Sequence, residues 1–139
     1  MSIKNKIKIP NHLICLSPWI ISDVKKEYWN KNLNNDYLTP YTINLAEKTV
    51  LESTDYYQYN PLFFDYNKFP NFLIRAGSCE LILDEIYQLI NIIKKSKCNF
   101  KYHIVNSMYH SFDLYYTFSK SESPDYDKLI NYIKDCIIN

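Results

Sequence analysis

Two residues of the sequence are of the types that move protons, and each follows an apolar run. Glu80 lies three residues after Gly77, which ends the run NFLIRAG, and His110 lies five residues after Val105, which ends the run FKYHIV. A carboxylate that accepts a hydrogen bond from one imidazole nitrogen fixes the tautomer of the ring and leaves the other nitrogen available as a base. The pair therefore indicates acid–base chemistry, provided that the fold brings the two side chains together.

Three apolar runs, at residues 12–21, 71–77 and 100–105, predict strands, because short continuous apolar runs are typical of strands in a covered sheet. Residues 39–52 predict a helix with Thr39 as N-cap and Pro40 at its first position. A second helix follows residue 77, with Ser78 as its expected cap, and a last one starts at Ser123 and Pro124. Residues 23–38 indicate a loop or a short helix. The apolar residues at helical spacing are Ile82, Ile86, Leu89, Ile90 and Ile93 in the second helix, and Tyr126, Leu129, Ile130, Ile133 and Ile137 in the last.

This alternation of strands and helices predicts an α/β domain, residues 1–139, with three parallel strands flanked by helices. In open α/β sheets, functional sites form at the carboxyl ends of the strands. The segments GSCELILDE and NSMYHSFD, which contain Glu80 and His110, follow two of those ends. Loops that leave neighbouring parallel strands at one edge can bring an acid and an imidazole into contact.

The amino-acid composition indicates a folded domain and gives no sign of a nucleic-acid partner. Of the 139 residues, 47% are hydrophobic and 22% charged, and the net charge is +1. A core is therefore expected, and nothing favours nucleic acid as a partner. The cysteines (Cys15, Cys79, Cys98 and Cys136) lack metal-ligand spacing and are expected to be reduced thiols. No apolar run is long enough to span a bilayer. Lysines interrupt the first residues throughout, so these residues lack the apolar core of a signal peptide. A cytoplasmic location is therefore expected.

Taken alone, both candidate residues also have ordinary explanations. A carboxylate in the first turn of a helix, where Glu80 is expected, is favourable because of the helix dipole. A histidine in a loop is usually only a solvated polar residue. His12 precedes a strand and His103 lies within one, so neither is a stronger candidate than His110.

Several further segments match a known family in order and spacing. They are LSPW at residues 16–19, NNDYLTP at 34–40, NPLF at 60–63, FPNFLIRAGSCELILDE at 69–85 and MYHSF at 108–112. Together they resemble the C-terminal half of the hormone-sensitive-lipase-like (fold-3) branch of the α/β-hydrolases. This branch comprises esterases, lipases and arylacetamide deacetylases. The resemblance covers nearly the whole chain.

The resemblance implies roles for particular residues. Glu80 falls on the acid of the Ser-His-Asp/Glu triad, Asp84 on a second acid four residues later, and His110 on the triad histidine. The triad acid of this family is more often Asp than Glu, so Asp84 remains an alternative, although it is expected within the helix. The implied substrates are esters or lipid-like small molecules. No metal and no organic cofactor are implied.

The nucleophile of this family is a serine in G-x-S-x-G, and its oxyanion hole also uses a glycine-rich motif. Gly77 is the single glycine of the sequence, so neither motif is present. The remaining serines, such as Ser17, Ser107 and Ser111, are poor substitutes. We therefore expect a hydrolase fragment without its nucleophile-elbow half and inactive alone. The alternatives are a non-catalytic binding or scaffold protein, and one chain of a split hydrolase that an N-terminal chain complements.

Overall fold

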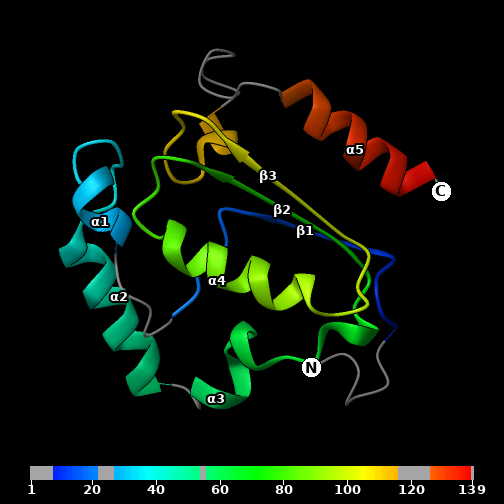
Figure 1. Ribbon diagram of the computed structural model, residues 1–139, viewed down its shortest axis with the longest axis horizontal. Coiled ribbons are helices and arrows are strands. Elements are labelled where there is room, and N and C mark those ends of the chain that lie inside the picture. The colour runs from blue at the N-terminus through cyan, green and yellow to red at the C-terminus, as the bar shows by residue number, and fades with distance from the viewer. Residues whose placement is uncertain (1–7, 22–26, 54–55, 116–125, 139) are drawn as a thin grey trace.

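The computed structural model describes residues 8–21, 27–53, 56–115 and 126–138. Within them, three strands form one parallel sheet in the spatial order β1–β2–β3 (Figure 1). They are β1 (His12–Leu16), β2 (Asn71–Gly77) and β3 (Phe100–Val105). The predicted strands at 71–77 and 100–105 are confirmed with the same bounds. The first strand is shorter than its apolar run, because Ser17 adopts a left-handed φ of 47° that ends the extended backbone.

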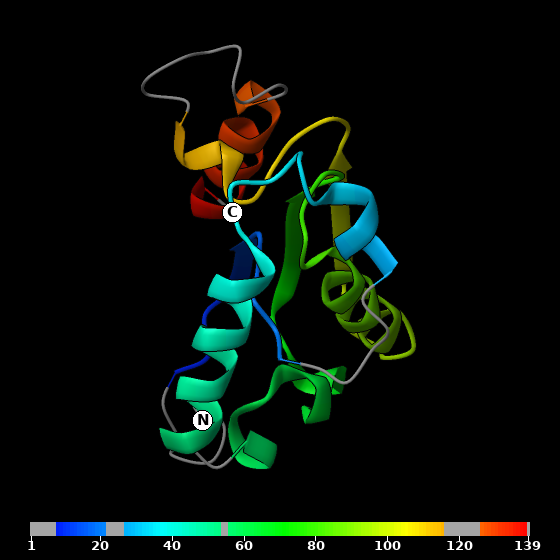
Figure 2. The same cartoon turned by 90° about the vertical axis from the view of Figure 1, so that its left-hand side faces the viewer.

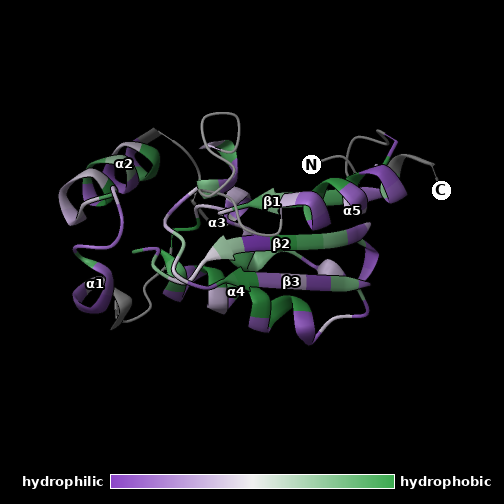
Figure 3. Ribbon diagram, turned by 90° about the horizontal axis from the view of Figure 1, so that it is seen from above, coloured by the Kyte–Doolittle hydropathy of each residue, from purple (hydrophilic) through white to green (hydrophobic). Residues whose placement is uncertain are grey.

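Helices lie on both sides of this sheet. They are α1 (Glu27–Asn32), α2 (Pro40–Ser53), α3 (Tyr56–Tyr59), α4 (Leu83–Lys94) and α5 (Tyr126–Ile138), with short 3-10 helices η1 (Pro61–Phe63), η2 (Tyr66–Lys68) and η3 (Phe112–Tyr115). Figures 1 and 3 show α4 on one face of the sheet and α5 on the other. Figures 1 and 2 show α1 and α2 beyond the carboxyl ends of the strands. The predicted α/β class with a parallel sheet is confirmed.

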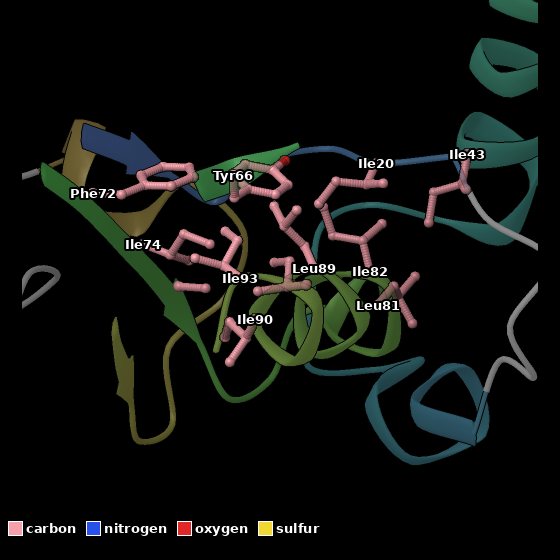
Figure 4. Packing of buried hydrophobic residues seen from close by; sticks show 12 residues of the cluster. Ile20, Ile43, Tyr66, Phe72, Ile74, Leu81, Ile82, Leu89, Ile90 and Ile93 are labelled. Atoms are coloured by element: carbon pink, nitrogen blue, oxygen red, sulfur yellow. The ribbon is translucent and has the colours of Figure 1, made fainter. Parts of the chain in front are cut away.

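The core lies between the sheet and α4 (Figure 4). Alternation along β2 turns Phe72, Ile74 and Ala76 toward this core. The predicted stripe of α4 meets them from the opposite side, and Ile86, Leu89, Ile90 and Ile93 are all at most 2% exposed. Burial of a side chain of this size stabilises a fold by about 1.5–3 kcal/mol, so this layer fixes the position of β2.

Helix α2 begins as predicted, since Pro40 is its first residue and the Thr39 hydroxyl oxygen accepts a hydrogen bond from the Thr42 amide at 3.2 Å. The start of α4 differs from expectation. Ser78 does not cap this helix, which follows Ile82 without a side-chain cap. Ser78 instead accepts a hydrogen bond from the Ser107 amide. The expected start of the last helix at Ser123 and Pro124 lies outside the described residues.

Glu80 is not in the first turn of α4, where the sequence pattern places it. The helix begins at Leu83, and Glu80 lies in the turn between β2 and α4. Its carboxylate is held there by hydrogen bonds from distant parts of the chain, so contacts across the fold determine its position. The ordinary explanation, a surface carboxylate beside a helix dipole, does not fit a side chain that is 0% exposed.

None of the described helices has both the length and the apolar character needed to cross a bilayer. The four cysteines are free thiols, and each is half-buried rather than fully buried. Burial raises the pKa of the Cys15 thiol to about 11, which keeps it protonated at neutral pH.

Candidate active site

The two loops that carry Glu80 and His110 leave the sheet side by side. Gly77 and Val105 are register partners, so β2 and β3 end at the same level. The Cys79 amide then donates to the Met108 carbonyl at 2.8 Å, which joins the loops directly. Gly77 permits this approach, because a Cβ atom there would overlap the Met108 carbonyl. The single glycine of the sequence thus allows the two loops to pack together.

Glu80 and His110 meet at this edge of the sheet. The Nδ1 atom of His110 lies 3.0 Å from Oε2 of Glu80. Glu80 is 0% exposed and His110 is 9% exposed, so the contact is almost shielded from water. The expectation that the two loops bring an acid and an imidazole together is confirmed. Asp84 is not part of the contact, since it lies in the first turn of α4.

The Glu80 carboxylate has a hydrogen-bond donor on each oxygen. Oε1 accepts from the Ser17 hydroxyl at 2.7 Å and from the Gly77 amide, while Oε2 faces His110. A buried carboxylate needs such donors, because burial without them costs several kcal/mol. These contacts hold the carboxylate in one orientation toward the imidazole.

His110 presents its second nitrogen away from the acid. Among the described residues, Nε2 has no hydrogen-bond partner. The imidazole contacts the rings of Trp19 and Tyr37 edge-on, with centroids 6.2 and 6.0 Å away. When Nδ1 carries the proton and donates to Glu80, Nε2 has a lone pair that can accept a proton from a substrate or nucleophile.

Ser17 supports the acid and is not positioned as a nucleophile. Its hydroxyl donates to Glu80 and accepts from the Ser111 amide at 2.9 Å. The hydroxyl is therefore engaged both as a donor and as an acceptor, once by each loop. Ser17, Ser107 and Ser111 have φ values of 47°, 59° and 53°. Such left-handed conformations cost about 1–3 kcal/mol each and persist where the surroundings impose them.

A buried ion pair fixes the chain just after His110. The Nε atom of Arg75, on β2, donates to both carboxylate oxygens of Asp113 at 3.0 and 2.9 Å. Both side chains are at most 3% exposed. The guanidinium also lies over the Phe112 ring, 5.1 Å from its centroid, and contacts Nδ1 of His103 at 2.8 Å. His103 is therefore engaged on the far face of the sheet from α4.

Three tyrosine rings form a cluster beside His110. The rings of Tyr37, Tyr109 and Tyr115 lie 5.8 to 6.3 Å apart, all edge-on. Burial, with further contributions from Tyr115 and Asp36, raises the pKa of Tyr37, so its phenol is neutral at physiological pH. The residues that the structure describes contain no group of three side chains that could hold a metal ion.

Sequence patterns do not identify several residues that hold the pair in place. The sequence indicates that Ser17 is a poor candidate for the nucleophile, but no pattern around residue 17 predicts its contact with Glu80. Asn32 and Asp36, from the asparagine-rich segment, hydrogen-bond the backbone of both loops. Arg75 does have a signal, because a charged residue within an otherwise apolar buried strand requires a partner.

No protein-family model and no curated protein matches the sequence. Solved structures match the fold. A hormone-sensitive-lipase homologue from a metagenome library, EstE7, has a TM-score of 0.84 at 20% identity and covers 98% of this chain. EstE5 has a TM-score of 0.84 at 18% identity over 99% of the chain. An esterase of the bacterial hormone-sensitive lipase family has 0.78 at 20% identity over 96%.

The chain spans only about half the length of these structures, namely 48%, 48% and 45%. The likeness extends over nearly the whole chain, since it covers 98% of it in the first of them. The chain therefore has the fold of the C-terminal half of an α/β-hydrolase.

Proposed function

We propose that this chain carries two of the three triad residues of a serine-type carboxylic-ester hydrolase. In this proposal His110 is the general base and Glu80 is the acid that orients it. The observation that supports it most strongly is the buried Nδ1–Oε2 contact of 3.0 Å, with Nε2 left without a partner among the described residues. The hydrolase fold supports the same roles, because triads of this kind recur on it.

The nucleophile and the oxyanion hole are proposed to come from residues outside this 139-residue sequence. The sequence has one glycine and thus no G-x-S-x-G motif, and the hydroxyl of Ser17 is turned to the acid rather than to His110. The missing groups would lie on the same polypeptide or on a complementing N-terminal chain. Residues 1–139 would then be one part of a single hydrolase domain.

In the assembled site, the serine hydroxyl would lose its proton to Nε2 of His110 as its oxygen attacks the ester carbonyl carbon. The imidazolium would be stabilised by Glu80 and would then give the proton to the leaving alcohol. Water would repeat the sequence to release the carboxylic acid. The proposed substrates are esters or lipid-like small molecules, in keeping with the neighbours described as esterases and as a lipase.

Glu80 rather than Asp84 is proposed as the triad acid. Glu80 contacts His110 and is completely buried, whereas Asp84 lies in the first turn of α4. Glu80 lies in the turn before α4, and from there its carboxylate contacts the imidazole at 3.0 Å.

The test is to combine this chain with a polypeptide that bears the elbow half and to assay p-nitrophenyl ester hydrolysis. His110→Ala and Glu80→Gln should each lower kcat, the latter by about 10⁴-fold, the loss typical of a triad acid replaced by its amide. Asp84→Asn is the matched control and should retain most of the activity. Activity that survives Glu80→Gln but not Asp84→Asn would transfer the role to Asp84.

A further inference from the structure

Two side chains, one at the end of α1 and one in the segment that follows it, contact the backbone of the two site loops. The Asn32 amide nitrogen donates to the carbonyls of Ser78 and Glu80 at 3.2 and 2.9 Å. Four residues on, the Asp36 carboxylate accepts from the Leu81 amide at 2.9 Å and from the His110 amide at 3.2 Å. This segment thus binds one loop through its carbonyls and both loops through their amides.

We propose that Asp36 is a positioning residue that sets the separation and orientation of Glu80 and His110. This inference rests on the proposed function, because it assigns Asp36 a role only through those two residues. Oδ2 holds the amide of Leu81, the residue directly after Glu80, and Oδ1 holds the amide of His110 itself. A single planar carboxylate therefore fixes the backbone at both members of the pair.

The chemistry of the contact requires a carboxylate. The backbone groups that approach it from the two loops are both N–H donors, so both oxygens must accept. Hydrogen bonds to a charged acceptor are about twice as strong as neutral ones. An asparagine at this position keeps one acceptor but turns an NH₂ group toward the other amide, so one of the two bonds is lost.

Other hydrogen bonds also join the loops, and they do not replace this one. The Cys79 amide to Met108 carbonyl bond lies nearer the strands, and the Ser17 hydroxyl holds the Glu80 side chain and the amide of Ser111, one residue after His110. Asp36 binds at the backbone of His110. Without it, the loops remain joined at their base while the imidazole gains freedom relative to the acid.

Asp36 also makes a hydrogen bond within its own segment, and a control variant must separate that local contact from the positioning of His110. Oδ1 also accepts from the Leu38 amide at 3.4 Å, which is a turn within its own segment. Asp65 makes the same kind of local turn, accepting from the Asn67 amide at 3.0 Å at an exposed position. Asp65→Ala is therefore the matched control for loss of a local carboxylate turn.

The experiment records ring ¹⁵N shifts and the Nδ1 proton of His110 by NMR in the 139-residue chain and its variants. The sequence has three histidines, so assignment by single substitution is practical. The wild type should show one tautomer with the proton on Nδ1. Asp36→Ala should mix the tautomers and speed exchange of the Nδ1 proton by about tenfold or more, because it removes the hydrogen bonds to both the Leu81 and the His110 amide. Asp36→Asn should be intermediate, and Asp65→Ala should match the wild type.

Each outcome decides between the claims. A wild type with mixed tautomers contradicts the Glu80–His110 pair, and with it both the proposed function and this inference. An ordered wild type with an equally ordered Asp36→Ala overturns the inference alone, as does an equal effect of Asp65→Ala. Should far-UV circular dichroism show that Asp36→Ala is unfolded, the isosteric Asp36→Asn decides: faster exchange supports the positioning role, and unchanged exchange overturns it.

Discussion

At the scale of single residues, Glu80 shows how a buried acid is held in place by groups far away in the sequence. Ser17 is 63 residues from Glu80, and it is 94 residues from Ser111, whose amide donates to the Ser17 hydroxyl. Ser17 therefore connects the end of β1 with the acid and with the histidine loop. Its left-handed backbone is the conformation that turns the hydroxyl to both partners.

Ser17→Ala should lower the free energy of unfolding by about 1–3 kcal/mol, because it leaves the Ser111 amide and one Glu80 lone pair without their partner. The measurement is urea denaturation followed by circular dichroism. Thr49→Ala is the control, since the Thr49 hydroxyl binds only a carbonyl of its own helix at an exposed site. It should change stability by less than about 0.5 kcal/mol. Equal effects of the two substitutions would contradict the role assigned to Ser17.

The candidate pair itself could be predicted from the sequence, because Glu80 and His110 follow strands whose ends must lie together. The residues that support the pair could not. Asp36 is 74 residues from His110, and its partners are backbone amides, which look the same at every position of a sequence. Only the three-dimensional arrangement shows which serine, asparagine or aspartate meets those amides.

At the scale of elements, the strands and the long helices follow from apolar periodicity, while the turn between β2 and α4 does not. The pattern places Glu80 in a helix with Ser78 as its cap. In the structure, Ser78 and Cys79 instead form hydrogen bonds with the histidine loop, and the helix begins only at Leu83. Contacts between loops thus outweigh the local preference for an early helix start.

Gly77→Ala should test how closely the two loops approach. The added Cβ would overlap the Met108 carbonyl, so the histidine loop must shift or the strand must distort. We expect a loss of about 1–3 kcal/mol or more in the free energy of unfolding, as for other overpacked sites. Asn91→Ala, at an exposed position of α4, should leave stability nearly unchanged. A Gly77→Ala variant as stable as the wild type would contradict the close packing of the loops.

The ion pair between β2 and η3 leads to a separate prediction. Asp113→Ala should lower the free energy of unfolding by about 3–5 kcal/mol, because it removes the carboxylate that pairs with the buried charge of Arg75. Joint replacement, Arg75→Met with Asp113→Leu, should recover much of that loss. Glu52→Ala, which breaks the exposed Lys48–Glu52 pair at 3.8 Å, serves as control and should cost at most about 1 kcal/mol. An Asp113→Ala variant no less stable than Glu52→Ala would rule out an anchoring role.

At the scale of the whole molecule, the described part of the chain leaves one edge of β1 without a paired strand. In the described part of the chain, β1 pairs only with β2. Asn11 and Ser17 bond to β2, so alternation turns the amides of His12, Ile14 and Leu16 to the other edge. Trp19 and Tyr37 are 38% and 52% exposed beside His110. Unpaired strand edges and exposed aromatic rings favour association with further protein.

The isolated chain should therefore self-associate as its concentration rises, which sedimentation velocity measures directly. Ile14→Pro should weaken this association, because proline removes an outward-pointing amide and leaves the bonds to β2. Circular dichroism checks that the variant keeps its fold. A wild-type chain that stays monomeric at high concentration and unfolds in one sharp thermal transition would contradict the open-edge account.

We propose that this chain holds the acid and the base of a hydrolase but not its nucleophile. The most direct measurement is p-nitrophenyl acetate turnover by the purified chain alone, together with labelling by a fluorophosphonate, which reacts with activated serines. We predict no turnover above that of His110→Ala and no labelled serine. Turnover that disappears in His110→Ala, or a serine of this chain that becomes labelled, would contradict the claim.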